Sequence, residues 1–296
     1  MAKSTGKKEQ SLAFGGQALI EGIMMRSGDH VVICVRQPDG GISTYNQEIN
    51  SRVKQGRVLG LPFIRGIIIL FETMYFGIKG IFHSANVALD DDEEFTWKEY
   101  VLVLVAVVGM IGFFMVTPFL LANYLGLTGF FLNITESAVR LTLFGLYLFF
   151  VSRWGEFRRV LQYHGAEHKA INAHEAGANM DTETVAEFSR LNPRCGTSFL
   201  FIVMIISILV FSVLPRSSFM MRIAYRIILI PVLGAISYEV LKVSDKYRDS
   251  PVMQLVITPG LAMQRLTTQE PEPSMIEVAL AALKEVKRLN KIDPSG

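Results

Sequence analysis

The chain is 296 residues long, 50% of its residues are hydrophobic, and its mean hydropathy is +0.35. These values are high for a soluble protein and favour a membrane protein, so the lipid bilayer is the first expected partner. The formal net charge is only +2, and no dense basic segment alternates with aromatic residues, which argues against a nucleic-acid partner. A homo-oligomer is compatible with this composition.

The N-terminal residues predict membrane insertion by internal segments, and the two cysteines predict a reducing environment. Residues 1–13 are mostly polar and lack the apolar core of a signal peptide, so they are expected to be a polar tail and not a cleaved leader. Cys34 and Cys195 are too few for a disulfide framework. We interpret both as reduced thiols on the cytoplasmic side.

Residues 14–60 are predicted to form a small cytoplasmic β element. The segment from Phe14 to Arg26 is punctuated by glycines, which suits a tight, buried backbone. Val31 to Arg36 has the composition of a strand, Pro38 to Gly41 that of a turn, and Ile42 to Ile49 that of the returning strand. We interpret this hairpin as structural.

Residues 61–97 are expected to comprise an amphipathic helix and an acidic linker. The apolar stretch from Leu61 to Phe82 carries Arg65, Glu72 and Lys79 at intervals of seven residues, on one stripe of a helix. Each charge would cost about 2.5 to 3.5 kcal/mol at the centre of a bilayer. We therefore expect this helix to lie at the membrane interface or against the bundle, while a spanning orientation remains open.

The expected fold class is mainly α, a polytopic membrane helix bundle with about four spans, together with the small N-terminal β element and a C-terminal amphipathic helix. The first two spans fall within residues 98–152 and the last two within residues 198–242. The predicted spans are Tyr100 to Ala122, Ser137 to Val151, Thr197 to Leu214, and Ile223 to Leu241. The second and third are close to the minimum of about 17 residues that a bilayer requires.

The distribution of Lys and Arg predicts the orientation. Ten of these residues precede Trp97, six lie in residues 153–197 and eight in residues 242–296, whereas the opposite side has few, among them Arg140 and Arg226. The positive-inside rule therefore predicts a multi-pass protein of the cell membrane with both termini in the cytoplasm.

Residues 153–197 are expected to be a cytoplasmic loop that holds an H-x-x-E-H pattern. Positions i and i+4 of a helix share a face, so His164 and His168 can bind one metal ion, zinc or another divalent metal. Glu167 would then act as the general base toward a water molecule. The same spacing also fits two core-facing histidines that only form hydrogen bonds.

Three residues are candidates for the third metal ligand. Glu239 is the first choice, because an ionisable group near the hydrocarbon boundary is costly unless it is ligated or paired, for example with Arg or Lys242. Glu175 is the second choice and Cys195 the third, since its sulfur suits zinc. An oxyanion could be stabilised by Lys169, Arg194 or Gln17.

Residues 243–296 are predicted to be a cytoplasmic segment that ends in an amphipathic helix. Ser274 and Glu277 have the spacing of a capping box, and an apolar stripe follows, consisting of Ile276, Leu280, Leu283 and Val286. We expect this helix to pack on the β element or on another copy of the chain.

Several motifs together resemble the YqhQ-like bacterial membrane proteins. They are GGQALIEGIMMR, YHGAEHKAINAHE, NPRCGTS, ISYEVLKVSD and QRLTTQEPEPSMIEVALAALKEV, which extend from about Phe14 to Val286. The resemblance implies a predicted metal-dependent enzyme and supplies no substrate. It departs at Asn192, where the family usually has His, and if that His is a ligand the site is altered here.

Two functions from different classes follow. The first is a membrane-embedded, metal-dependent hydrolase with a cytoplasm-facing site and an unidentified substrate. The second is a non-enzymatic membrane scaffold or small transporter with a structural metal or none. Four protein ligands would favour the scaffold, and three with an open position would favour catalysis.

Overall fold

The computed structural model describes residues 14–49, 51, 53, 58–89, 96–127, 129–213, 218–247 and 250–290. The predicted polar tail and the acidic run Asp90 to Glu94 lie outside these residues. The helices are α1 (Ile64–Leu89), α2 (Trp97–Tyr124), α3 (Gly129–Val151), α4 (Gly155–Glu175), α5 (Thr182–Ala186), α6 (Gly196–Val213), α7 (Phe219–Ile228), α8 (Ile230–Lys246), α9 (Pro251–Thr267) and α10 (Pro273–Leu289).

A four-stranded antiparallel sheet forms the N-terminal part. Its strands β1 (Phe14–Leu19), β2 (Gly22–Ser27), β3 (His30–Arg36) and β4 (Ile42–Glu48) pair in sequence order. The predicted hairpin is confirmed as β3 and β4, with Arg36 opposite Ile42. The glycine-punctuated segment before it is a second hairpin, β1 and β2, whose turn places Glu21 at a φ of 48°.

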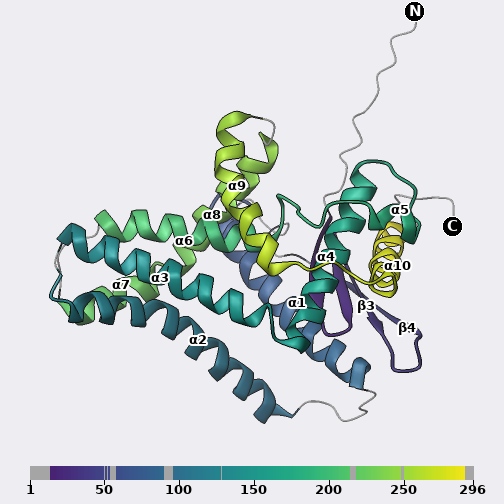
Figure 1. Ribbon diagram of the computed structural model, residues 1–296, viewed down its shortest axis with the longest axis horizontal. Coiled ribbons are helices and arrows are strands. Elements are labelled where there is room, and N and C mark those ends of the chain that lie inside the picture. Colours follow the sequence, from purple (N-terminus) through teal and green to yellow (C-terminus); the bar gives the residue numbers. More distant parts are fainter. Residues whose placement is uncertain are drawn as a thin grey trace, which may run out of the picture.

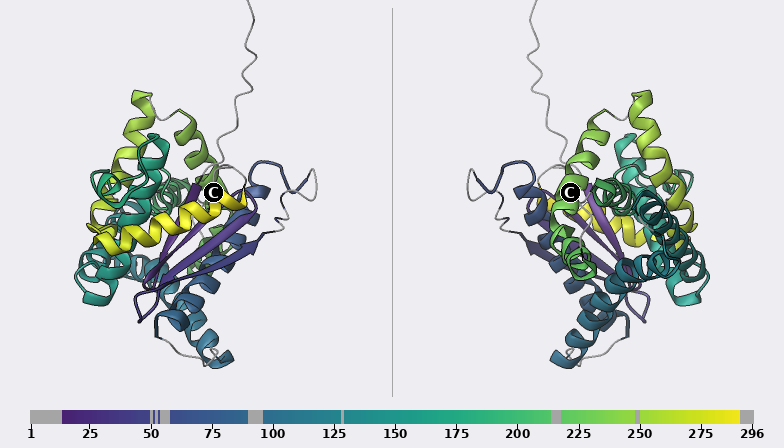
Figure 2. Two further views of the ribbon diagram at one scale, coloured as in Figure 1. Left: turned by 90° about the vertical axis from the view of Figure 1, so that its right-hand side faces the viewer. Right: turned by 90° about the vertical axis from the view of Figure 1, so that its left-hand side faces the viewer.

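The two central strands are buried on both faces, because successive side chains of a strand point to opposite sides of the sheet. One face packs against α4 and α10 and contributes Ile23, Met25, Val32 and Cys34. The other packs against α1 and contributes Met24, Val31, Ile33 and Val35. The sheet, α4 and α10 thus share one apolar core, which is called the sheet core below (Figures 1 and 2).

The C-terminal helix packs on the β element, as expected, through Met275, Val278, Ala282 and Val286. The predicted capping box is not formed. The helix begins at Pro273, and Glu277 accepts a hydrogen bond of 2.7 Å from Arg36 of β3 instead of closing on its own backbone. This contact adds a polar link between α10 and the sheet.

The remaining helices form a bundle beside the sheet core, with α2, α3, α6 and α7 on the far side of α1 in Figure 1. Three helices are long and apolar enough to cross a membrane among the described residues, namely α2, Phe131–Val151 of α3, and α6. The second of these begins well before the predicted Ser137, so it is not short. The fourth predicted span is divided into α7 and α8, with Leu229 at the junction.

Polar residues inside the bundle bond to one another. Glu136 of α3 accepts hydrogen bonds of 2.6 Å from Arg140 and 2.5 Å from Arg226 of α7, and all three side chains are buried. A buried carboxylate between two guanidinium groups avoids the large cost of burying an unpaired charge. Arg140 and Arg226 therefore belong to the interior of the bundle and not to the exposed loops that the sequence suggested.

The charged stripe of α1 faces protein partners. Arg65 bonds Glu239 of α8, Glu72 accepts hydrogen bonds from Ser51, and Lys79 donates one of 3.0 Å to Gln47 of β4. Elsewhere around its circumference, α1 exposes apolar side chains, among them Phe71 at 59% and Tyr75 at 62%. The helix therefore joins the sheet to α8 by its polar stripe and leaves part of its apolar surface uncovered.

Candidate metal centre

Helix α4 carries the H-x-x-E-H residues at the border between the sheet core and the bundle. Its Tyr163, Ala166 and Ala170 pack into the sheet core. His164 follows Tyr163 in the chain and lies next to this buried face of the helix. The rings of His164 and His168 are in edge-to-face contact, with centroids 4.4 Å apart. The spacing of four residues thus brings the two imidazoles together on one side of the helix, as the sequence predicted.

Backbone carbonyls determine which ring nitrogens are available. The Nδ1 atom of His164 lies 2.7 Å from the carbonyl oxygen of Thr267, and Nδ1 of His168 lies 2.6 Å from that of Arg190. A carbonyl only accepts, so each Nδ1 carries the proton and donates. In the neutral ring Nε2 then has a free electron pair, which is the arrangement that metal-binding histidines share.

Cys195 is the third donor. Its Sγ lies 3.1 Å from Nε2 of His164, and ligand atoms of His164, His168 and Cys195 all lie within 4.8 Å of one another. In a tetrahedral zinc site with bonds of about 2.0 and 2.3 Å, nitrogen and sulfur are about 3.5 Å apart. The nitrogen of His164 and the sulfur of Cys195 are therefore close to the spacing that one zinc ion requires.

A glycine between the two histidines permits the chain after α9 to cross α4. A Cβ atom at Gly165 would clash with the carbonyl oxygen of Gln269. The crossing chain is held by a hydrogen bond of 2.8 Å from the amide of Gln269 to the carbonyl of Leu161. This close approach brings the Thr267 carbonyl to His164, so Gly165 helps to orient that ring.

Glu167 is buried beside the donors, with 4% of its surface exposed. Its Oε2 atom has no hydrogen-bond partner among the described residues, which is uncommon for a buried polar atom and calls for a functional explanation. The carboxylate lies against β1, where a Cβ at Gly16 would be 2.8 Å from its Cδ atom. Burial raises the pKa of Glu167 to about 7, an effect that nearby His164 partly offsets, so the group can exchange a proton near neutral pH.

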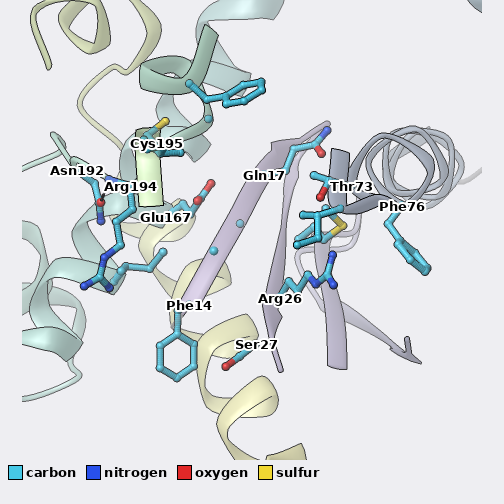
Figure 3. Close-up of a pocket in the computed structure, with 18 of the residues that line it drawn as sticks. Phe14, Gln17, Arg26, Ser27, Thr73, Phe76, Glu167, Asn192, Arg194 and Cys195 are labelled. Atoms are coloured by element: carbon cyan, nitrogen blue, oxygen red, sulfur yellow. Dashed lines mark hydrogen bonds between the residues drawn. The ribbon is translucent and has the colours of Figure 1, made fainter. Parts of the chain in front are cut away.

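A cavity of about 470 Å³ lies beside the donors, between the sheet, α1, α4 and α8. Glu167, Asn192, Arg194 and Cys195 lie on one side of it, and Gln17, Arg26 and Thr73 lie on the other (Figure 3). His168 also lines the cavity. Glu167 and two of the three donors can therefore contact a molecule held there.

Glu239, the expected third ligand, lies elsewhere, and the structure brings Cys195 to the two histidines instead. Both of its carboxylate oxygens bond Arg65 of α1, at 2.8 and 2.5 Å, and it is absent from the donor group. The ion pair with an Arg, the alternative considered from the sequence, is what the structure contains. Glu175, the second choice, accepts a hydrogen bond of 2.5 Å from Arg194.

The residues considered for an oxyanion fall into two groups. Lys169 donates to the carbonyl of Ala186 and pairs with Glu270 at 3.0 Å, and it does not line the cavity. Gln17 and Arg194 do line it. Asn192 bonds Asn172 and the amide of Arg194 and also borders the cavity.

The comparisons with known proteins concern almost the whole chain. Residues 61–289 match the family described as "Protein of unknown function (DUF1385)". The chain belongs to this family. It is 35% identical over 300 residues to "Uncharacterized protein YqhQ" of Bacillus subtilis (strain 168), with 95% of this chain and 94% of that protein covered. No solved structure matches the chain. The resemblance seen in the sequence motifs is thereby confirmed, and the match to the family begins after the sheet.

Proposed function

We propose that this protein is a metal-dependent hydrolase whose active site lies where the sheet core meets the membrane bundle. The observation that carries the proposal is the convergence of two imidazole nitrogens and one thiol beside a buried carboxylate that lacks a partner. Imidazole with thiolate is a donor set that suits zinc. Three protein donors leave a fourth position, as catalytic zinc sites do.

Each residue has a defined part in the proposed reaction. His164, His168 and Cys195 would hold the ion, which when bound supplies a Lewis acid for a carbonyl or phosphoryl oxygen. Glu167 takes a proton from water as the water oxygen attacks the substrate, and it returns that proton to the leaving group as the bond breaks. Burial favours this role, because it raises the pKa of the carboxyl group and so strengthens the group as a base. Gln17 and Asn192 border the cavity and can position the substrate by hydrogen bonds.

The cysteines provide a direct test, because the chain has only two. Alkylation requires the thiolate, which a bound metal engages. We expect chelation with EDTA to increase the alkylation of Cys195 roughly ten-fold, and zinc to reverse the increase. Cys34 is the internal control, since burial in the sheet raises its pKa to about 11 and keeps it protonated. Mass spectrometry of the detergent-solubilised protein reads both sites, and equal labelling of Cys195 with and without chelator would contradict a metal site there.

The sheet core also supports a membrane topology. The sheet, α4 and α10 form one apolar core, so they lie on the same side of a membrane. The chain must therefore cross an even number of times between the sheet and α4, and again between α4 and α10. Between the sheet and α4, helices α2 and α3 give two crossings, and α1 need not cross. Between α4 and α10, helix α6 crosses once and the chain returns through α7 and α8. Four crossings result, and the positive-inside rule assigns the sheet core to the cytoplasm.

Single introduced cysteines test this topology in intact cells. Asn179→Cys, after α4, should resist a membrane-impermeant maleimide, whereas Asn123→Cys, at the end of α2, should react. Both positions are exposed, and the native cysteines are buried, so the parent protein gives a low background. Reaction of Asn179→Cys from outside would mean that the sheet core lies outside the cell and would refute the cytoplasmic site.

A further inference from the structure

The cavity beside the proposed metal site is lined by both charged and apolar side chains. Its apolar lining comes from the bundle side and the sheet, and includes Met24, Ile69, Leu70, Phe76, Phe199 and Leu241. Three cationic side chains, those of Arg26, Arg194 and Lys242, also line it, against the single carboxylate of Glu167. Such a lining suits a molecule that is anionic at one end and apolar along the rest.

Lys242 is the cation that is available to a ligand. Arg26 lies 3.6 Å from Glu72, and Arg194 lies 2.5 Å from Glu175, so carboxylates of the protein already balance both guanidinium groups. Lys242 is exposed and forms no hydrogen bond or ion pair with any side chain that the structure describes. The carboxylate of Glu239, which interacts electrostatically with Lys242, is already held through both oxygens by Arg65. A ligand anion would therefore gain a contact here without displacing an internal pair.

The position of the cavity fits a ligand that comes from the bilayer. Helix α1, which lines it, lies between the sheet core and the bundle (Figure 1), and α8, which also lines it, belongs to the proposed return crossing. Lys242 is close to the end of α8, which finishes at Lys246. The outer side of α1 is apolar and exposed, with Phe71 and Tyr75 uncovered, as expected for a helix at the membrane interface.

We infer that the cavity binds a single-chain anionic amphiphile, with its phosphate or carboxylate at Lys242 and its chain between α1 and the sheet. This inference rests on the proposed function in so far as it names the substrate class of the metal site. A volume of about 470 Å³ is within the range of about 300 to 1,000 Å³ that holds a drug-sized ligand. It accommodates a headgroup and part of one chain, and is small for a lipid with two complete chains.

Native mass spectrometry of the full-length protein in neutral detergent tests the inference with three probes. They are lysophosphatidate, which has both chain and anion, lysophosphatidylcholine with the same chain, and inorganic phosphate. We expect lysophosphatidate to bind about ten-fold more tightly than lysophosphatidylcholine, as for one charge-assisted contact, and inorganic phosphate not to bind. Binding of inorganic phosphate alone would identify a free-anion site and overturn the inference, as would equal affinity for the two lysolipids.

Variants on the lining locate the binding. Lys242→Ala should weaken lysophosphatidate about five-fold, as for an exposed ion pair, and should leave lysophosphatidylcholine unchanged. Lys246→Ala is the matched control, one turn further along α8 and outside the cavity lining. Thr73→Trp, at an exposed lining position that a large side chain can fill without unfolding the protein, should weaken both lysolipids. Equal effects of the two lysine variants would show that the preference is not local to the cavity and would refute the inference.

Chelation separates this inference from the proposed function. Lysolipid binding is compared between protein treated with EDTA and protein incubated with zinc. If both samples prefer lysophosphatidate and zinc is not bound stoichiometrically, the binding inference stands and the hydrolase proposal fails. If zinc is bound and protects Cys195 but no preference for the anionic lysolipid is found, the hydrolase proposal stands and the inference fails.

Discussion

Glu167→Gln should keep the fold and the bound metal, and should lose activity by about 10² to 10⁴-fold, the usual contribution of general acid–base catalysis. The amide has the shape of the carboxyl group and fits against Gly16 of β1, where even a Cβ atom would lie only 2.8 Å from the native side chain. It cannot take a proton from water. A loss of this size should abolish complementation of a deletion strain at native expression.

The control for this experiment is the same substitution at Glu156, an exposed carboxylate in the first turn of the same helix. Glu156→Gln should complement fully. Metal content and thermal stability are measured for both variants beside the complementation. If Glu167→Gln retains metal and also complements fully, catalysis by this residue is refuted, and only a structural role for the metal remains, as in a membrane scaffold.

His168→Ala should lose the metal and the stabilisation that the metal provides. A ligand that binds only the folded state at 100 times its dissociation constant stabilises that state by about 2.7 kcal/mol. We therefore expect added zinc to raise the Tm of the wild-type protein and to leave that of His168→Ala unchanged. The loss follows because Nε2 of His168 is free to bind a metal while Nδ1 is held by the carbonyl of Arg190.

Glu239→Gln is the matched control for the metal variants. Its carboxylate bonds Arg65 and lies outside the donor group, so this variant should retain the full response to zinc. The free energy of unfolding of Glu239→Gln should fall by about 1 kcal/mol at most, because the native ion pair with Arg65 is partly exposed. Loss of the zinc response in Glu239→Gln, with Cys195→Ser unaffected, would restore Glu239 as the third ligand and contradict the geometry described above.

The local part of the site could be predicted from the sequence, and the distant part could not. The spacing of His164 and His168 predicts a shared helix face because helix geometry is local. The position of Cys195 depends on how the chain folds back between α4 and α6. The periodicity of the sequence does not predict that path. The sequence favours Glu239 because its apolar surroundings make an unpaired charge costly, and that cost is met instead by Arg65, 174 residues away.

The same division applies to the fold. Turn residues predict the hairpin of β3 and β4, whereas β1 and β2 escape prediction as strands because glycines weaken the strand signal of Phe14 to Arg26. Pro231, at the start of α8, was the available signal that the segment from Ile223 to Leu241 is not one helix. The heptad spacing places the charges of α1 on one stripe, but their partners on the sheet and on α8 depend on tertiary contacts.

The most direct test of the metal centre is X-ray absorption spectroscopy at the zinc edge on the purified protein, with elemental analysis of the same sample. We expect one zinc per chain, with one sulfur at about 2.3 Å and imidazole nitrogens at about 2.0 Å. Cys195→Ser should remove the sulfur shell and Glu239→Gln should leave it unchanged. Absence of stoichiometric metal, or a first shell without sulfur, would contradict the centre formed by His164, His168 and Cys195.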